Sequence, residues 1–88
     1  MFAIGQLLAT PGALEAFART GDDPIDYLVR HVSRDWGTVD AEDWHANDQA
    51  LIEGTRLLSA YRLNDGTKVW IITEADRSAT TVLLPEEY

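Results

Sequence analysis

The side chains best suited to acid–base chemistry in this sequence are His31 and Asp35. They stand four positions apart, a spacing that can bring an imidazole and a carboxylate within reach as a general acid and base. No recognisable motif supplies a nucleophile for them. His31 also falls near the expected end of a helix, where a protonated imidazole interacts well with the last carbonyl groups and the helix dipole. We favour that structural interpretation.

A metal site is a second possibility. Glu42 and His45 have the i, i+3 spacing found in carboxylate-bridged di-metal helix bundles, but such sites need the motif twice. Only one copy is present here. The chain has no cysteine, which removes thiolate ligands and thiol nucleophiles, and no glycine-rich phosphate loop is found. We therefore expect neither a metal nor a cofactor.

Three charged residues, Glu74, Asp76 and Arg77, lie between two apolar runs near the end of the sequence. In a structural interpretation, Asp76 accepts hydrogen bonds from its own turn and Arg77 pairs with Glu74 or with an acid on a neighbouring helix. In a functional interpretation, the three form a polar site at the end of a sheet, joined by Arg56 or His31. We favour the structural interpretation.

Asn47 and Asp48 are polar residues on the expected inward face of a helix, beside Trp44. A buried polar side chain without a partner costs about 1–3 kcal/mol. We therefore expect Asn47 to bond to strand or loop backbone and Asp48 to hold Arg56 or Arg62. If they stay unpaired inside a concavity, they mark a binding site.

Three helices are expected in the first part of the chain, at 10–21, within 22–37 and at 40–54. Thr10, Asp23 and Asp40 are the expected N-caps, and Gly21 and Gly54 the expected ends of the first and third helices. The expected inward apolar residues are Leu14, Phe17 and Ala18, then Ile25, Leu28, Val29 and Val32, and finally Trp44, Leu51 and Ile52, with Trp36 lying over the core.

The second part of the chain changes to strand patterns at 56–63, 67–74 and 80–84. Asn64-Asp65-Gly66 predicts a hairpin with either a two-residue or a three-residue loop, and the two-residue register places Tyr61 opposite Trp70. We expect one α+β domain spanning 1–88, with three helices on one face of a small antiparallel meander. Residues 2–8 fit either a strand or a short helix.

Both faces of the expected hairpin carry apolar side chains, whereas helices can cover one face only. In the two-residue register, one face carries Leu57, Tyr61, Trp70 and Ile72, and the other Leu58, Ala60, Val69 and Ile71. A second copy of the chain would cover the remaining face, so a homodimer is one expectation.

The composition sets further limits on function. Fifteen acids against seven Lys and Arg among 88 residues give a net charge of −8, which opposes binding to nucleic acid. Hydrophobic residues at 45% indicate a folded domain. The absence of cysteine favours a reducing compartment such as a bacterial cytoplasm. The first residues do not resemble a signal peptide, and no apolar run approaches the length of a membrane span.

Much of the sequence resembles a family of small bacterial proteins called plasmid-related proteins, some of which carry the name type I restriction endonuclease subunit M. The resemblance runs through "ATPGALEAF", "LVRHVSRDWG", "EDWHANDQALIEGTRLLSAYRL" and "VWIITEADRSATTVLLPEEY". It implies a bacterial origin and an association with mobile DNA, but no mechanism. A chain of 88 residues cannot hold a methyltransferase domain, and no catalytic string of one is present.

These observations favour a non-enzymatic module that binds another protein through an acidic surface containing tryptophan, such as an inhibitor of a defence or nucleic-acid-handling enzyme. The alternative is a small enzyme or ligand-binding domain with one polar pocket around His31, Arg56 and residues 74–77. The candidate site residues for these two hypotheses are His31, Asp35, Trp36, Trp44, Asn47, Asp48, Arg56, Glu74, Asp76 and Arg77. Convergence of the polar candidate residues in one cleft would favour the alternative hypothesis of an enzyme or ligand-binding domain.

Overall fold

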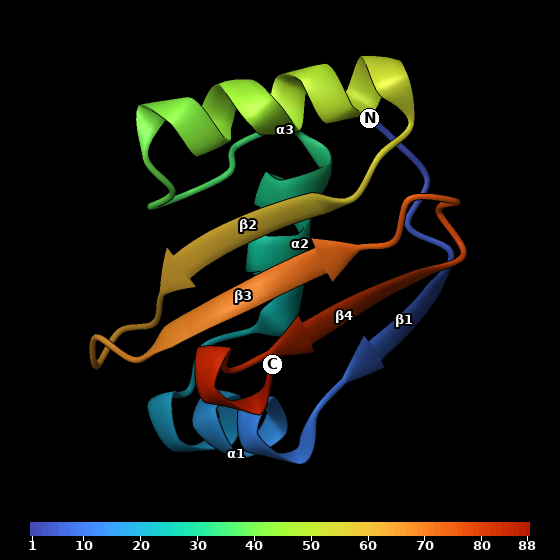
Figure 1. Cartoon of the computed structure of the whole chain (residues 1–88). Coiled ribbons are helices and arrows are strands. Elements are labelled where there is room, and N and C mark those ends of the chain that lie inside the picture. The colour runs from blue at the N-terminus through green and yellow to red at the C-terminus, as the bar shows by residue number, and fades with distance from the viewer.

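The computed structural model describes every residue from 1 to 88 and confirms the α+β class (Figure 1). The elements in chain order are strand β1 (Gln6–Ala9), helices α1 (Pro11–Thr20), α2 (Pro24–Val32) and α3 (Ala41–Glu53), strands β2 (Leu57–Arg62), β3 (Lys68–Thr73) and β4 (Ala79–Leu83), and a 3-10 turn, η1 (Pro85–Glu87). The ambiguous N-terminal segment therefore contributes a strand.

The helix boundaries follow from the capping residues that the sequence predicts. Thr10 Oγ1 accepts a hydrogen bond from Ala13 N at 3.2 Å. At the second and third helices, Asp23 and Asp40 accept from backbone N–H groups at 2.9 and 2.8 Å. These bonds satisfy amide groups that have no partner inside the helix. Gly21 and Gly54 end α1 and α3 in the left-handed conformation.

The four strands form one mixed sheet in the order β1-β4-β3-β2. The meander of β2, β3 and β4 is antiparallel, close to the expected ranges. The first strand adds to its far edge, parallel to β4, with Gln6 beside Ala79 and Ala9 beside Val82. Strand propensity could not reveal this pairing, because three helices and two strands separate β1 from the strand that it joins.

The hairpin between β2 and β3 adopts the three-residue alternative. Leu63 N donates to Thr67 O at 2.8 Å, and Gly66 takes a positive φ of 88°. Tyr61 consequently lies opposite Val69. The pairing of Tyr61 with Trp70 in the two-residue register is wrong, and these two side chains point to opposite faces of the sheet.

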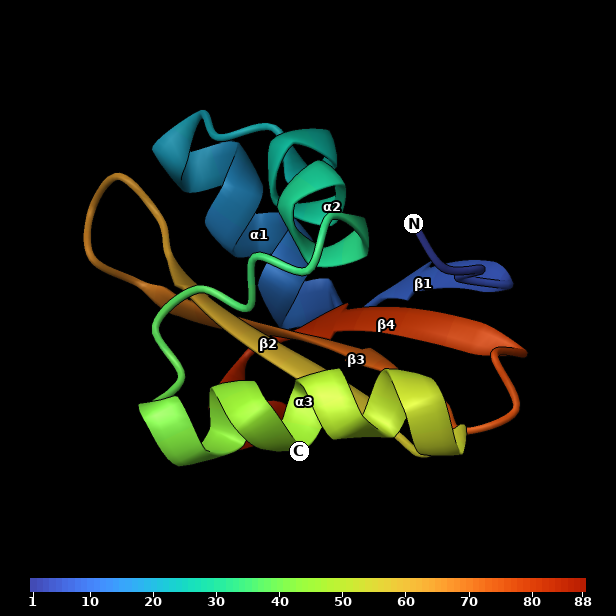
Figure 2. The ribbon, with the colours of Figure 1, turned by 90° about the horizontal axis from the view of Figure 1, so that it is seen from above.

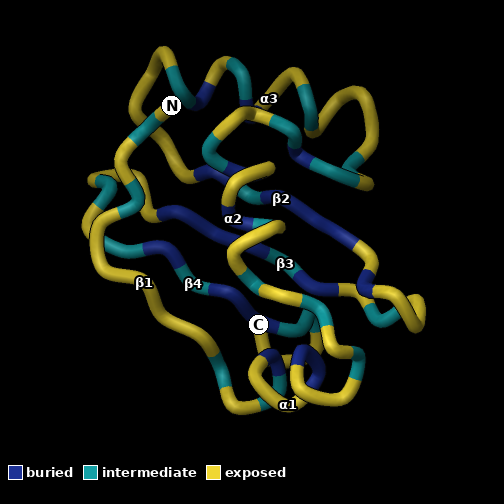
Figure 3. Tube along the Cα trace, turned by 180° about the vertical axis from the view of Figure 1, so that it is seen from behind, coloured by how far each residue is buried: buried dark blue, intermediate teal, exposed yellow.

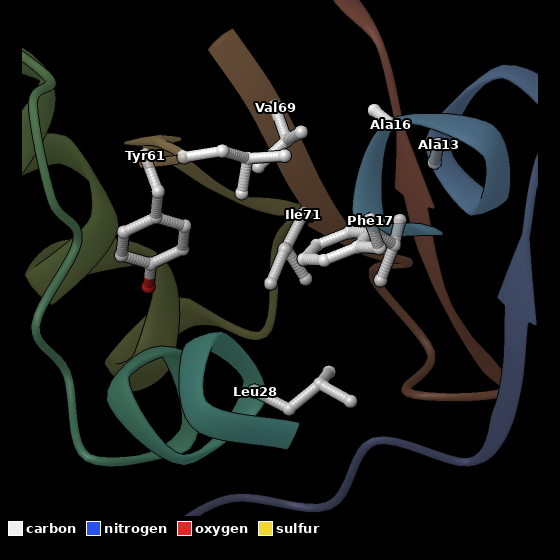
Figure 4. Close-up of a cluster of buried hydrophobic side chains, with 9 residues drawn as sticks. Ala13, Ala16, Phe17, Leu28, Tyr61, Val69 and Ile71 are labelled. Atoms are coloured by element: carbon white, nitrogen blue, oxygen red, sulfur yellow. The ribbon is translucent and has the colours of Figure 1, made fainter. Parts of the chain in front are cut away.

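One face of the sheet packs against α1 and α2 (Figure 2). Figure 4 shows this core, in which Phe17 and Leu28 meet Tyr61, Val69 and Ile71. The third helix departs from the expected arrangement, because it runs along the β2 edge on the side away from α1 and α2.

The expected inward faces of the helices are also only partly correct. The buried residues of α3 are Asn47 and Ala50, whereas Ile52 is 80% exposed. Phe17 and Leu28 lie inside as predicted, but Leu14, Ala18, Ile25 and Val29 are exposed. The apolar stripe that the sequence pattern predicts is wider than the part of each short helix that contacts the sheet. Apolar residues at the margins of the stripe therefore stay exposed.

The second face of the sheet is covered in part by the C-terminal segment. The rings of Trp70 and Tyr88 meet edge to face with centroids 5.8 Å apart. Glu87 holds the segment in place, since it accepts from Thr10 Oγ1 at 2.5 Å and from Gly12 N at 3.1 Å. The chain thus supplies some of the cover that the sequence led us to expect from a second copy.

Candidate functional site

A chain of polar side chains lies buried between α2 and the sheet. His31 projects from α2 onto two strands, with Nδ1 2.5 Å from Ser59 Oγ and Nε2 2.9 Å from Thr73 Oγ1. Thr73 Oγ1 lies 2.7 Å from Thr80 Oγ1, which donates to the carbonyl of Ile4 at 2.8 Å. All four side chains are fully buried.

The direction of each hydrogen bond in this network can be assigned. Each hydroxyl has one hydrogen to donate. Thr80 donates its hydrogen to Ile4 O, so Thr73 must donate to Thr80. His31 Nε2–H then donates to Thr73, and in a neutral imidazole Nδ1 accepts from Ser59. A neutral imidazole therefore satisfies every hydrogen bond of the network.

The electrostatics agree with a neutral His31. Burial, assisted by the positive charge of Arg77, lowers the pKa of His31 from 6.5 to about 4. The expected protonated imidazole on the last carbonyl groups of a helix is therefore wrong. His31 lies in the last turn of α2 but faces the sheet, where no water can solvate a charge.

The acid–base pair of His31 and Asp35, the alternative that their spacing left open, does not form. The Asp35 carboxylate instead accepts from Arg30 Nε at 2.8 Å, and this hydrogen bond lowers the pKa of Asp35. The Asp35 backbone carbonyl accepts from the hydroxyl of Tyr61 at 2.6 Å, while burial raises the pKa of Tyr61 to about 12. Ser59 and His31 have the contact of a nucleophile and its base, but their burial leaves no room for a substrate.

The loop between β3 and β4 is organised by its own residues and by α3. Asp76 Oδ1 accepts from Ser78 N at 3.0 Å, as the structural interpretation predicts, and hydrogen bonds from Ser78 lower the pKa of Asp76. Arg77, at a φ of 61°, donates to carbonyl oxygens at the end of α3 and in the loop, those of Ala50, Thr55, Glu74 and Ala75.

Arg77 pairs with no carboxylate, so the ion pair expected with Glu74 or a helix acid is wrong. The two ion pairs of the molecule are Arg19–Asp65 and Arg30–Asp35. A guanidinium beside the carbonyl end of α3 is stabilised by the helix dipole, which replaces the missing carboxylate. Glu74 itself is exposed and contributes its backbone groups to the turn.

Asn47 and Asp48 both find partners. Asn47 forms two hydrogen bonds with the backbone of Leu58, one from Leu58 N at 3.1 Å and one to Leu58 O at 2.7 Å, as predicted. Asp48 accepts from Trp36 Nε1 at 3.1 Å rather than from Arg56 or Arg62. The amide of Asn47 therefore acts as an added strand residue on the edge of β2.

Arg56 stays exposed but packs on the C-terminal segment, whereas Trp36 leaves the surface altogether. Arg56 lies over the ring of Tyr88, 5.4 Å from its centroid, and donates to its hydroxyl. Trp36 is completely buried. An acidic surface that contains both candidate tryptophans is therefore wrong, and of these two only Trp44 remains partly exposed, beside Asp48.

The two shallow depressions on the surface of the molecule both lie beside Trp44. One shallow depression of about 460 Å³ is lined by Ala41, Trp44, His45 and Asp48. A second, of about 430 Å³, is lined by Ser33, Arg34, Trp44, Asp48, Leu51 and Ile52. Because Trp44 and Asp48 line both depressions, we call the two together the Trp44 surface.

The polar candidates do not converge. His31, Asp35 and Arg56 belong to three separate local contacts, while Asp76 and Arg77 organise the β3–β4 loop. None of these five residues lines either depression. No group of three or more His, Asp or Glu side chains is arranged to hold a metal ion, so the Glu42–His45 spacing acquires no further ligands.

Sequence reasoning missed Ser59, Thr73 and Thr80. Their signal is one Ser or Thr on each of three neighbouring strands, and only the three-residue register places Ser59 and Thr73 on one face. It missed Glu87 and Tyr88 as anchors of the tail for a similar reason. Their partners, Thr10 and Arg56, are distant along the chain.

The fold and the Trp44 surface define a small α+β domain whose buried polar side chains bond to one another and whose shallow depressions lie around Trp44 of α3. No family model, curated protein or solved structure matches the chain. None of the helices is long and apolar enough to cross a membrane.

Proposed function

We propose that this chain is a non-enzymatic protein-interaction module that binds a basic protein surface through the Trp44 surface. The observation that carries the proposal is the coincidence of concavity, a partly exposed tryptophan and exposed apolar area on α3. Tryptophan is enriched among the residues that dominate binding energy at protein interfaces. Ile52, which lines the same surface, is 80% exposed.

The charge of α3 supports a basic partner. The helix carries Glu42, Asp43, Asp48 and Glu53 and no Lys or Arg. The whole chain has a net charge of −8. Complementary charge speeds the encounter of two proteins and excludes partners of the same sign.

Basic surfaces are common on proteins that hold nucleic acid, because they neutralise phosphates. The resemblance to plasmid-related proteins supports placing this module on mobile bacterial DNA. Together they favour an inhibitor of a host defence or nucleic-acid-handling enzyme, one that acts in the cytoplasm by covering the basic surface of that enzyme and does not itself bind nucleic acid.

The test compares proteins captured from a bacterial host lysate by the wild-type chain and by three variants. Trp44→Ala removes the ring at the centre of the surface, and Ile52→Lys places a positive charge on its rim. We expect both variants to lose a basic protein that the wild-type chain retains.

Ile25→Lys is the matched control, since Ile25 is 54% exposed and lies on α2. It makes the same change of charge away from the Trp44 surface and should keep the partner. Circular dichroism confirms that each variant is folded. Equal capture by Ile52→Lys and the wild-type chain would refute the proposed surface.

A further inference from the structure

The two edge strands of the sheet, β2 and β1, differ in whether other parts of the chain bond to their outer backbone groups. Along β2, the side chain of Asn47 occupies the backbone groups of Leu58. At Ala60, the N–H donates to Trp36 O at 3.1 Å and the carbonyl accepts from Thr38 N at 2.7 Å. The β2 edge is thus closed by side-chain and backbone contacts, which prevents another strand from adding there.

The opposite edge, β1, is open. Gln6 N donates to Ser78 O at 2.9 Å and Thr10 N donates to Val82 O at 3.0 Å, so these amides point toward β4. Because peptide groups alternate along a strand, those of Leu7 and Ala9 point away from the sheet. All four residues of β1 are exposed, as Figure 3 shows along this edge.

The chemistry of this edge suits a second copy of the same chain. Residues 1–14 contain no Asp, Glu, Lys or Arg, although the whole chain has a net charge of −8. The acid held beside this segment is Glu87, which accepts hydrogen bonds from Thr10 Oγ1 and Gly12 N. Contact at β1 therefore brings fewer acids together than contact at α3, which carries Glu42, Asp43, Asp48 and Glu53. The edge is also apolar, because Leu7 is 46% exposed and Leu8 is 43% exposed.

We propose that β1 pairs antiparallel with β1 of a second copy about a two-fold axis at Leu8. In this register Leu7 lies opposite Ala9 of the second copy and Ala9 opposite Leu7, and each such pair exchanges both its N–H···O bonds. Leu8 then faces Leu8 of the second copy as a close cross-strand pair. The two four-stranded sheets become one continuous sheet.

This contact does not involve the Trp44 surface, which lies on α3 beside the opposite edge of the sheet (Figure 1). A dimer formed at β1 leaves both Trp44 surfaces open. The inference therefore stands or falls separately from the proposed function.

The experiment uses sedimentation velocity on the full chain and on paired charge variants. We expect the wild-type chain to sediment at twice its mass of 9.8 kDa at high concentration. Leu8→Lys and Leu8→Glu place like charges opposite one another, so each should sediment alone as a monomer. An equimolar mixture of the two should restore the dimer, since the charges then attract.

Ile52→Lys is the control, because it adds the same charge to an exposed apolar site on α3 and should leave the dimer intact. Amide exchange adds a second measurement, in which Leu7 and Ala9 should become protected as concentration rises. A monomeric wild-type chain at high concentration overturns the inference. So does a dimer that persists in Leu8→Lys, and so does a β1 edge that becomes protected only when a different protein is added.

Discussion

Acidification should destabilise this protein through His31. In the native state the neutral imidazole accepts from Ser59 and donates to Thr73 inside the core. A second proton would direct a donor at Ser59 Oγ and place a charge where no solvent reaches it. The unfolded chain has neither restriction and binds the proton at the ordinary pKa.

The size of the effect follows from the two pKa values. The pKa of His31 is 6.5 in the unfolded chain and about 4 in the fold. Each unit of difference corresponds to about 1.4 kcal/mol, so the full effect is about 3 kcal/mol. The native state holds fewer protons in this interval, so the stabilisation is complete above pH 6.5 and is lost as the pH falls toward 4. At about pH 5 the loss is about 2 kcal/mol.

Urea unfolding measured by tryptophan fluorescence at about pH 7 and about pH 5 gives the free energy of unfolding at each pH. His31→Gln is the control, since an amide keeps one donor and one acceptor but does not titrate in this range. Acid also reduces repulsion among the carboxylates, and this contribution is common to both chains. The informative quantity is the difference in pH dependence between them.

We expect the wild-type chain to lose about 2 kcal/mol more than His31→Gln between the two conditions. Parallel pH dependence in the two chains would refute the assignment of His31 as a buried neutral side chain. An NMR titration of the imidazole should place its pKa near 4, and a midpoint close to 6.5 would contradict the same reasoning.

Three further predictions concern stability and are measured by thermal or urea unfolding. Asn47→Ala should cost about 2–3 kcal/mol, because it leaves the N–H and carbonyl of Leu58 without their partner; a loss below about 0.5 kcal/mol would contradict this role. Gly37→Ala should cost more than about 2 kcal/mol, since the added Cβ would lie 1.9 Å from Ala60 O at a φ of 78°. Gly21→Ala adds a Cβ that meets nothing within 4 Å and should cost about 1 kcal/mol. Equal losses in the two variants would argue against the close approach of Gly37 to Ala60. Arg77→Ala should cost about 1–2 kcal/mol through the lost contacts at the end of α3. Arg77→Gly should cost less, because glycine adopts the φ of 61° without the backbone strain of other residues. A greater loss in Arg77→Gly than in Arg77→Ala would refute backbone strain at this position.

Much of the local structure could be predicted from the sequence because its causes are local. An N-cap such as Asp40 bonds to an amide three residues later, so both partners appear in one short stretch. The apolar runs of β2 and β3 and the turn residues between them similarly predict a hairpin. For the candidate site, the sequence identified Asn47 and Asp48 as groups that need partners, and named backbone as the partner of Asn47.

Only the tertiary structure decided what depends on residues distant in the chain. The contact of His31 with Ser59 joins residues 28 positions apart, so the sequence could not say whether this imidazole is charged at a helix end or neutral in the core. Arg77 likewise donates to the carbonyl groups of Ala50 in α3 and of Thr55 just beyond it, instead of pairing with the acids beside it in sequence. The parallel place of β1 beside β4 is set by how the three helices return the chain to the sheet. Local patterns fix which segments become helix or strand, but burial and charge state depend on which segments come to lie together.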